Sequence, residues 1–299
     1  MPFQIIPIPA LQDNYIWLLW HRDMPDCVVI DPGEARPVIR YLVQHQLSLS
    51  AILVTHHHWD HTNGIEALLQ QWPVPVFGPS REVISGLTHP LKADDQIKLL
   101  QGRVRFNILE IPGHTRGHIA YYGRLDLLRK VVLRPHSSFG LGFGHYADFT
   151  ESLLESYPIL FCGDTLFTAG CGRLFEGTAE QMYRSLMQLR ALPDKTQIYC
   201  GHEYTWANLC FAQYLEPQNP AIQARLKAVK CARAQLAPTV PSLLREEKLT
   251  NPFLRCDAAD FVRQVRLRWP YVGLSPIEIF KAVRQCKDNW IQAEFSKEV

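Results

Sequence analysis

The sequence lacks several features that would assign it to a specialised class of protein. None of its apolar runs approaches the ~18 residues that a membrane-spanning helix requires. Its net charge is only +2, so it has no broad cationic field of the kind that dominates nucleic-acid binding. The 17 glycines and 21 prolines follow no triplet period, which excludes a collagen-like rod. We therefore expect neither a membrane nor a nucleic acid as a partner.

The sequence also lacks any dense framework of cysteines. Its eight cysteines are scattered and form no Cys-x-x-Cys pair, which favours a reducing compartment. The first residues, MPFQIIPIPALQDNY, contain no basic segment and reach Asp13 before a long apolar core can form, unlike a secretory signal. These observations predict a cytoplasmic protein.

The apolar residues that are present predict an α/β fold. They make up 47% of 299 residues, which is enough for one large or two ordinary domains. Short apolar runs bounded by turn residues predict strands, and runs with apolar residues three or four positions apart predict helices on a sheet. The predicted strands are 3–8, 16–20, 27–30, 51–54, 106–111, 159–162 and 197–200, and the predicted helices are 35–46, 65–72 and 179–192.

After residue 202 the strand-like runs disappear and helical patterns replace them. Helices are predicted over 206–215, 221–236, 258–269 and 276–290, and the last begins with a capping box formed by Ser275 and Glu278 around Pro276. We therefore expect a catalytic domain over 1–202 and a smaller all-helical domain over 203–299. Residues 124–158 interrupt the strand pattern, and we interpret them as an ordered insertion with a Gly-rich turn and a short helix.

The strongest chemical signal is the run HHHWDH at residues 56–61, directly after a predicted strand. So many imidazoles beside a carboxylate would need partners if buried, and a metal ion supplies them all. His56 and His58 can converge on one cation, while Asp60 and His61 point to a second. Nitrogen ligands with one carboxylate favour Zn²⁺ or a similar first-row dication over Ca²⁺ or Mg²⁺.

Three further strand ends carry one metal-binding type of residue each. His114 lies in PGHTRGH after 106–111, Asp164 follows 159–162, and His202 follows 197–200. A single such residue after a strand is more often part of a capped turn than a ligand. Their common position raises the probability that they meet at one site.

These motifs, in this order, resemble the metallo-β-lactamase fold and within it the glyoxalase II (hydroxyacylglutathione hydrolase) family. The resemblance covers about residues 1–123 and 158–299, and its most specific parts are GDTLFTAGCGRLFEGT, GHEYT and AVRQCKDNW. It implies an αββα sandwich followed by the helical domain. It also implies hydrolysis of the thiolester S-D-lactoylglutathione to glutathione and D-lactate, the second step of methylglyoxal detoxification.

The resemblance further implies a set of metal ligands. Asp60 and Asp164 are the catalytic carboxylates, because they hold the metals between which a bridging hydroxide acts as the nucleophile. Two divalent ions are expected, with Zn²⁺ favoured and Fe²⁺ or Mn²⁺ also suited to the mixed ligands. Asp31 corresponds to an acid that orients a ligand imidazole, and His118 is expected to be structural. The implied ligands are His56, His58 and His114 for the first metal, Asp60, His61 and His202 for the second, and Asp164 as the bridge.

Substrate recognition is expected from residues outside the metal motifs. Arg284 and Lys287 lie three residues apart on the last predicted helix and share one face, which Lys281 extends. Such a cationic pair can bind a carboxylate of glutathione, although Lys281 itself is better explained as a solvated surface residue. The resemblance implies that the glutathione moiety is held by Arg173, Phe175, Tyr204, Arg284 and Lys287.

Other functions fit the same residues less well. A glutathione-persulfide dioxygenase shares the metal motifs but requires a single redox-active iron. A lactam-cleaving enzyme would lack the helical C-terminal part, and a phosphodiesterase or ribonuclease would need a basic groove. A metal-dependent binding module is disfavoured because every expected ligand is present. We expect a monomer whose partner is the small glutathione thiolester.

Overall fold

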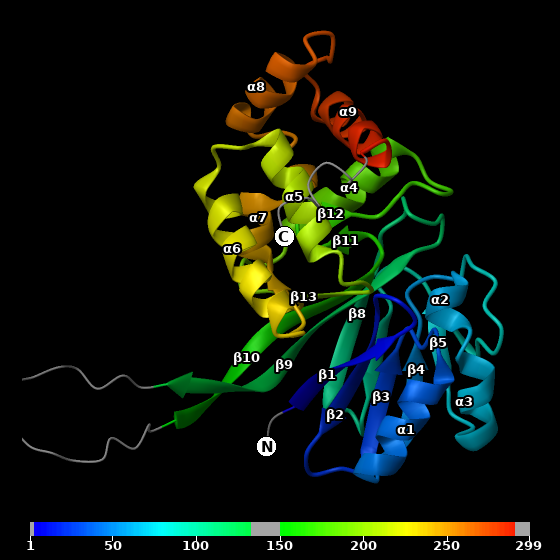
Figure 1. Cartoon of the computed structure of the whole chain (residues 1–299). Helices are drawn as coiled ribbons and strands as arrows, with labels where there is room; N and C mark the ends of the chain where they lie inside the picture. Colours follow the sequence, from blue (N-terminus) through cyan, green and yellow to red (C-terminus); the bar gives the residue numbers. More distant parts are fainter. Residues whose placement is uncertain (1–2, 133–149, 291–299) are drawn as a thin grey trace, which may run out of the picture.

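The computed structural model describes residues 3–132 and 150–290, and within them a connected sheet of twelve strands folds into two layers (Figure 1). Strand β9 (Ile119–Val132) joins the layers, because its middle touches β1 at a single parallel pair, Phe3 with Leu127. The first layer follows the order β1 (Phe3–Ala10), β2 (Asn14–His21), β3 (Asp26–Ile30), β4 (Ser48–Leu53), β5 (Val76–Pro79) and β6 (His89–Leu91). The second contains β7 (Gln96–Leu99), β8 (Val104–Glu110), β9, β10 (Thr150–Gly163), β13 (Gln197–Cys200) and β14 (Ser242–Leu243).

Side-chain alternation along the strands builds a core on each face of the first layer. In β2, Trp17 and Leu19 point into the core between the two layers, whereas Ile16 and Leu18 pack beneath the outer helices. Those helices are α1 (Ala35–His45) and α3 (Ile65–Gln71). On the other side, α4 (Ala179–Arg190) packs Met182, Leu186 and Leu189 into the core of the second layer. The predicted αββα sandwich is confirmed.

The C-terminal part is helical, as expected, with one exception. Its elements are α5 (Thr205–Leu215), α6 (Pro220–Ala234), α7 (Leu244–Thr250), a 3₁₀ turn at Pro252–Leu254, α8 (Ala259–Arg268) and α9 (Pro276–Asp288). Ser275 and Glu278 form the predicted capping box of α9. The expectation that strands end at residue 202 is wrong, because β14 pairs with β13. Two residues are too few to produce a periodic pattern, so tertiary pairing alone creates this strand.

The insertion also differs from its expectation. Instead of interrupting the strands, its described flanks extend them: β9 and β10 pair antiparallel from Tyr121 and Phe161 out to Val132 and Thr150. In Figure 1 this ribbon projects away from the two layers. The predicted short helix is therefore wrong for the described flanks, since each strand satisfies the backbone hydrogen bonds of the other. The predicted Gly-rich turn lies at 133–149, outside the described residues.

The loops that bear the metal-binding motifs gather at one end of the sandwich. They follow β4, β8, β10 and β13, and the first of them continues into the short helix α2 (Trp59–Thr62). Beside them lies a small hairpin of β11 (Leu166–Phe167) and β12 (Gly170–Cys171). Parallel pairing of β3 with β4 and of β10 with β13 brings loops from distant parts of the sequence to the same edge. In the described part of the chain, no helix is long and apolar enough to cross a membrane.

Candidate metal centre

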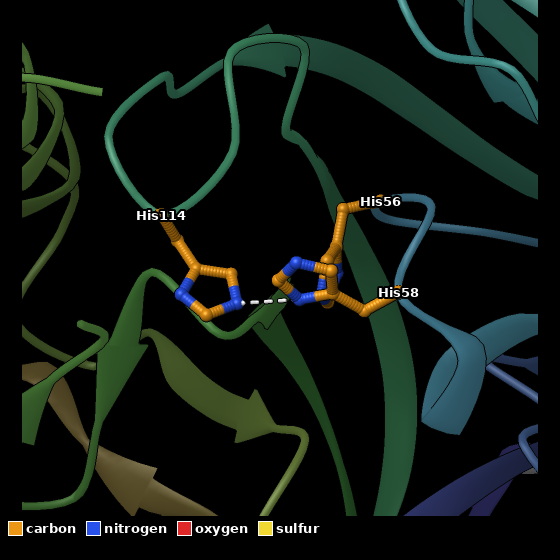
Figure 2. A group of neighbouring side chains, drawn as sticks. All are labelled: His56, His58 and His114. Atoms are coloured by element: carbon orange, nitrogen blue, oxygen red, sulfur yellow. Dashed lines mark hydrogen bonds between the residues drawn. The ribbon is translucent and has the colours of Figure 1, made fainter. Parts of the chain in front are cut away.

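Three imidazoles from two loops converge on one point. His56 Nε2 lies 3.1 Å from His58 Nδ1, and His114 Nε2 lies 3.0 Å from the same atom (Figure 2). A tetrahedral zinc ion with bonds of about 2.0–2.1 Å places its nitrogen ligands about 3.3 Å apart. The spacing of these nitrogens is therefore close to that of a metal-bound set. All three are among the residues whose ligand atoms could hold one ion.

A second group of mixed ligands lies directly beside the first. His61 Nε2 and His202 Nε2 lie 3.5 Å and 3.4 Å from Asp60 Oδ2. Asp164 Oδ1 lies 3.3 Å from His61 Nε2, while its Oδ2 lies 3.3 Å from His202 Nε2 and 3.6 Å from His114 Nε2. Asp164 is thus the carboxylate that touches both groups. The structure brings together all seven residues that the sequence analysis named as ligands.

Three buried atoms of this second group make no hydrogen bond within the described chain: Asp164 Oδ1, His61 Nε2 and, on the far side of the ring, His61 Nδ1. Asp164 Oδ1 and His61 Nε2 face one another at 3.3 Å. A buried carboxylate oxygen or imidazole nitrogen without a partner costs about 1–3 kcal/mol, and more when charged. A divalent cation between them would satisfy both, so the residues present fit a dinuclear metal site.

Outer contacts fix which nitrogen of each imidazole faces the site. His114 Nδ1 lies 2.9 Å from the Arg173 carbonyl oxygen, so this nitrogen donates and Nε2 is left to bind. His202 Nδ1 contacts Asp13 Oδ1 at 2.7 Å, and His61 Nδ1 lies 3.1 Å from Asp31 Oδ2. Carboxylate or carbonyl partners on the far nitrogen are typical of metal-bound histidines, because they fix the tautomer and the ring orientation.

Asp31 contacts the loop of residues 55–61 from a strained backbone position. Its φ of 53° lies in the left-handed region, which non-glycine residues rarely occupy. Its carboxylate accepts hydrogen bonds from the Thr55 backbone N–H at 2.7 Å and from Thr55 Oγ1 at 2.8 Å. The same carboxylate faces His61. The expected role of Asp31 in orienting an imidazole agrees with this geometry.

Charge and burial shift the pKa values of the histidines differently in the two groups. Burial lowers the pKa of His56 and His114 and lowers that of His58 to about 4, so these imidazoles stay neutral with free lone pairs. In the second group burial opposes charge, but the Asp164 carboxylate outweighs it and raises the pKa of both His61 and His202 above the usual value. The carboxylates of the second group therefore hold protons on His61 and His202, and a divalent cation would take the place of these protons.

Close backbone approaches leave no room for larger residues beside Asp164. A Cβ at Gly201 would lie 2.6 Å from Asp164 Oδ1 and 2.7 Å from His61 Cε1. Gly163 has a φ of 45°, a conformation that glycine adopts without the strain of a side chain. His118 lies on the other side and accepts a hydrogen bond from the Asp164 backbone N–H at 3.2 Å. His118 therefore supports the site structurally, as the sequence analysis expected.

Other supporting residues carry no sequence pattern that singles them out. Asp13 holds His202, and Asn14 Nδ2 donates to Asp60 Oδ2 at 3.0 Å. Glu82 lies between β5 and β6 and contacts the loops of His57 and Thr115. Each is an isolated polar residue in a turn, and only the folded chain shows its partners.

The C-terminal part holds the β11–β12 hairpin in place beside Asp164. Glu247 is fully buried and accepts a hydrogen bond from the Ala169 backbone N–H at 2.7 Å, where Ala169 has a φ of 56°. Asn251 Nδ2 donates to the carbonyls of Phe167 and Gly170 at 3.2 Å and 2.9 Å. The helical region thus helps to shape the metal site itself.

The aromatic residues expected to contact the substrate lie at the opening of the site. Phe175 is 63% exposed, and its ring centroid lies 5.5 Å from that of His58 and 5.3 Å from that of His114. Tyr204 stacks on His202 with the ring centroids 4.7 Å apart. The two rings therefore flank the two groups of ligands, one on each side.

The expected basic residues form a cluster with unequal access to solvent. Lys281 and Arg173 are exposed, Lys287 is half-buried, and Arg284 is only 4% exposed. Arg284 Nη1 donates to the Cys171 carbonyl at 3.0 Å, and its Nη2 donates to Asp288 at 2.8 Å. Burial, together with the nearby charges of Arg284 and Arg173, lowers the pKa of Lys287 to about 8. The residues predicted to form one basic face are therefore together, but Arg284 is committed mainly to the protein.

Comparison with known proteins assigns both parts of the chain to families. The model of the metallo-beta-lactamase superfamily matches residues 12–202, and that of the hydroxyacylglutathione hydrolase C-terminus matches residues 203–290. A protein of Vibrio cholerae named hydroxyacylglutathione hydrolase is 44% identical over 288 residues, covering 96% of this chain and 99% of its own length. One of Nitrosomonas eutropha with the same name is 42% identical over 289 residues, covering 96% and 98%.

Solved structures agree on the fold. ETHE1 from Myxococcus xanthus superposes with a TM-score of 0.57 at 23% identity, covering 96% of this chain and 100% of that one. The B3 metallo-beta-lactamase BLEG-1 gives a TM-score of 0.53 at 21% identity, covering 84% and 99%. At this identity the likeness shows a shared architecture and carries no information on substrate.

Proposed function

Because the chain belongs to the hydroxyacylglutathione hydrolase family of the metallo-beta-lactamase superfamily, we propose that it hydrolyses S-D-lactoylglutathione to glutathione and D-lactate. The observation that carries this proposal is the meeting of two ligand groups at the orphaned Asp164 carboxylate, beside a basic cluster. The proposed reaction is the second step of methylglyoxal detoxification.

The proposed ligand sets follow the two groups in the structure. Asp164 bridges them, since its two carboxylate oxygens face histidines of different groups. The mixture of imidazole nitrogen and carboxylate oxygen favours Zn²⁺, and Fe²⁺ or Mn²⁺ suit the same donors. The first metal would be held by His56, His58 and His114, and the second by Asp60, His61 and His202.

The residues around the metal site have different roles in the proposed reaction. A bound pair of dications supplies a water of lowered pKa and polarises a carbonyl oxygen. Asp60 and Asp164 keep the net charge of the centre low, so that only a small positive charge remains to favour a developing oxyanion. Asp13 holds His202 in the tautomer that metal binding needs, and the Asp31 carboxylate lies 3.1 Å from His61 Nδ1. No serine or cysteine nucleophile is required by this arrangement.

Recognition of glutathione is assigned to the opening of the site. Phe175 and Tyr204 flank the ligand groups and can confine an acyl chain between them. Arg173 is exposed, and Arg284 adds a positive charge from within the protein. Lys287 Nζ donates to the Ala207 carbonyl at 3.3 Å and lies over the Phe211 and Trp290 rings. A carboxylate of glutathione would be bound by charge-assisted hydrogen bonds to this cluster.

The runner-up function, oxidation of a glutathione persulfide, is less well supported. It requires one redox-active iron, whereas both ligand groups are complete here. Residues 203–290 match the C-terminal model of the hydrolase family, and the likeness to ETHE1 is one of fold.

The division into a catalytic domain (1–202) and a substrate-binding domain (203–299) is part of the proposal, as are a cytoplasmic location and a monomeric state. The positions of the ligands before residue 203, and of Lys287 and Arg284 after it, support the division into two domains. The scattered cysteines support a cytoplasmic location.

A direct assay separates these functions. Purified protein, reconstituted with Zn²⁺, Fe²⁺ or Mn²⁺ in turn, would be tested for hydrolysis of S-D-lactoylglutathione and for oxygen uptake with glutathione persulfide. We expect two metals per chain by elemental analysis and hydrolysis without oxygen uptake. Oxygen uptake with one iron per chain and no hydrolysis would refute the proposed function.

A further inference from the structure

Glu82 occupies a place between two metal-binding loops. Its carboxylate is 3% exposed and lies in the segment that connects β5 to β6, away from every ligand motif. A buried carboxylate is costly unless several hydrogen-bond donors surround it.

Each oxygen of Glu82 serves a different loop. Oε2 accepts hydrogen bonds from the His57 backbone N–H at 2.5 Å and lies 3.0 Å from His57 Nδ1. Oε1 accepts from the Gly117 backbone N–H at 3.0 Å and from the hydroxyl of Thr115. One carboxylate thus joins the loop of residues 56–61 to the loop of residues 112–118.

Two of the residues that Glu82 contacts, His57 and Thr115, are next to the three ligands of the first group in the sequence. His57 stands between His56 and His58, and Thr115 directly follows His114. A Cβ at Gly117 would lie 2.5 Å from Glu82 Cγ, so the glycine permits this close approach. The backbone on both sides is therefore fixed within one residue of each ligand.

We propose that Glu82 is a positioning residue that holds the loops of His58 and His114 at the separation that binds the first metal. This rests on the proposed function, since it concerns the same metal centre. Glu176 also joins the two loops, because its Oε1 lies 3.3 Å from His57 Nε2 and its Oε2 accepts a hydrogen bond from the Arg116 backbone N–H at 3.0 Å, but its side chain is 33% exposed whereas that of Glu82 is buried. Without the buried link of Glu82, the lone pairs of the ligand imidazoles oppose one another until a cation is present. The second group shares the loop of residues 56–61, but Asp13 and Asp31 give it contacts of its own, so we expect it to depend less on Glu82.

The test is metal binding to the metal-free chain, measured by competition with a chromophoric chelator of Zn²⁺. In Glu82→Gln one oxygen becomes an amide NH₂ group, which cannot accept a hydrogen bond from either loop. We expect one of the two dissociation constants to rise about 10- to 100-fold and the other to change less than about threefold. The control is Glu66→Gln, because Glu66 is an exposed glutamate of α3 that accepts a hydrogen bond from Ser85 at 2.6 Å.

A second pair of variants assigns the effect to one metal and guards against misfolding. In a His114→Ala background, which removes a ligand of the first group, adding Glu82→Gln should cause no further change in the remaining dissociation constant. If Glu82→Gln does not fold, Thr115→Val removes one of its donors and should weaken the same metal, whereas Thr115→Ser should restore it.

The outcomes separate this inference from the proposed function. Unchanged dissociation constants in Glu82→Gln, with or without a lower unfolding temperature of the metal-free chain, would overturn the positioning role. Weakening of both metals alike would also overturn it. Failure of the unaltered protein to bind two metals or to hydrolyse the thiolester would instead refute the proposed function.

Discussion

Replacement of Arg284 by alanine tests what the basic cluster of α9 does. The structure predicts two effects, because this guanidinium is both buried and close to the opening of the site. Its removal leaves the Cys171 carbonyl without a donor, which costs about 1–3 kcal/mol. The pair with Asp288 contributes at most about 1 kcal/mol, since Asp288 is 41% exposed.

These contributions give an expected loss of about 1–4 kcal/mol in the free energy of unfolding. Arg173, two residues after Cys171, holds His114 through its carbonyl oxygen, so disorder of this loop also reaches the metal site. We expect kcat/KM for S-D-lactoylglutathione to fall about 10- to 100-fold, by the loss of a charged contact. Urea unfolding and initial rates would measure both quantities.

The control for this experiment lies one turn earlier on the same helix. Lys281 is exposed, and Lys281→Ala should leave the free energy of unfolding and kcat/KM almost unchanged. If Arg284→Ala raised KM tenfold while the free energy of unfolding stayed within about 0.5 kcal/mol of the original, our assignment of its donors to the protein would be wrong. A thiolester without carboxylates should respond only to the structural part of the effect.

Three other changes test the metal centre and the substrate cluster. Asp164→Asn should lower metal content and reduce kcat by more than about a hundredfold, and two metals per chain with normal turnover would contradict the bridging role. Gly201→Ala places a Cβ 2.6 Å from Asp164 Oδ1, so elemental analysis should show metal loss while circular dichroism shows an intact fold. Lys287 is cationic below its pKa of about 8 and neutral above it, so KM should rise up to about tenfold between pH 7 and 9. The same rise in Lys287→Met would assign it to another group.

The ligand residues could be predicted from the sequence because each follows an apolar run. Strand ends at one edge of a sheet are close in space even when they are distant along the chain, as His58 and His114 show. Asp13 and Glu82 could not be predicted in this way. Their partners lie 189 and 25–35 residues away, and a polar residue in a turn has no periodic pattern that reveals a partner.

The fold shows the same division between local pattern and tertiary pairing. The amphipathic pattern predicted α4 and α9, and the capping box of α9 was also predicted, since apolar spacing and capping are local properties. The two-residue strand β14 and the long ribbon of β9 and β10 depend instead on backbone pairing with a neighbouring strand. Nothing in the order of their side chains fixes that pairing.

The wide separation of the supporting contacts has a consequence for the order of events during synthesis. Asn14 and His202 lie 3.5 Å apart in the folded chain but 188 residues apart in the sequence. At about 5–20 residues per second, a ribosome needs roughly 10–40 s to add that stretch. The histidines of residues 56–61 are made long before Asp164 and His202 exist to complete their site. During synthesis the residues of 56–61 therefore form an incomplete group of metal ligands. Both metals can be bound stably only after the later strands have joined the sheet.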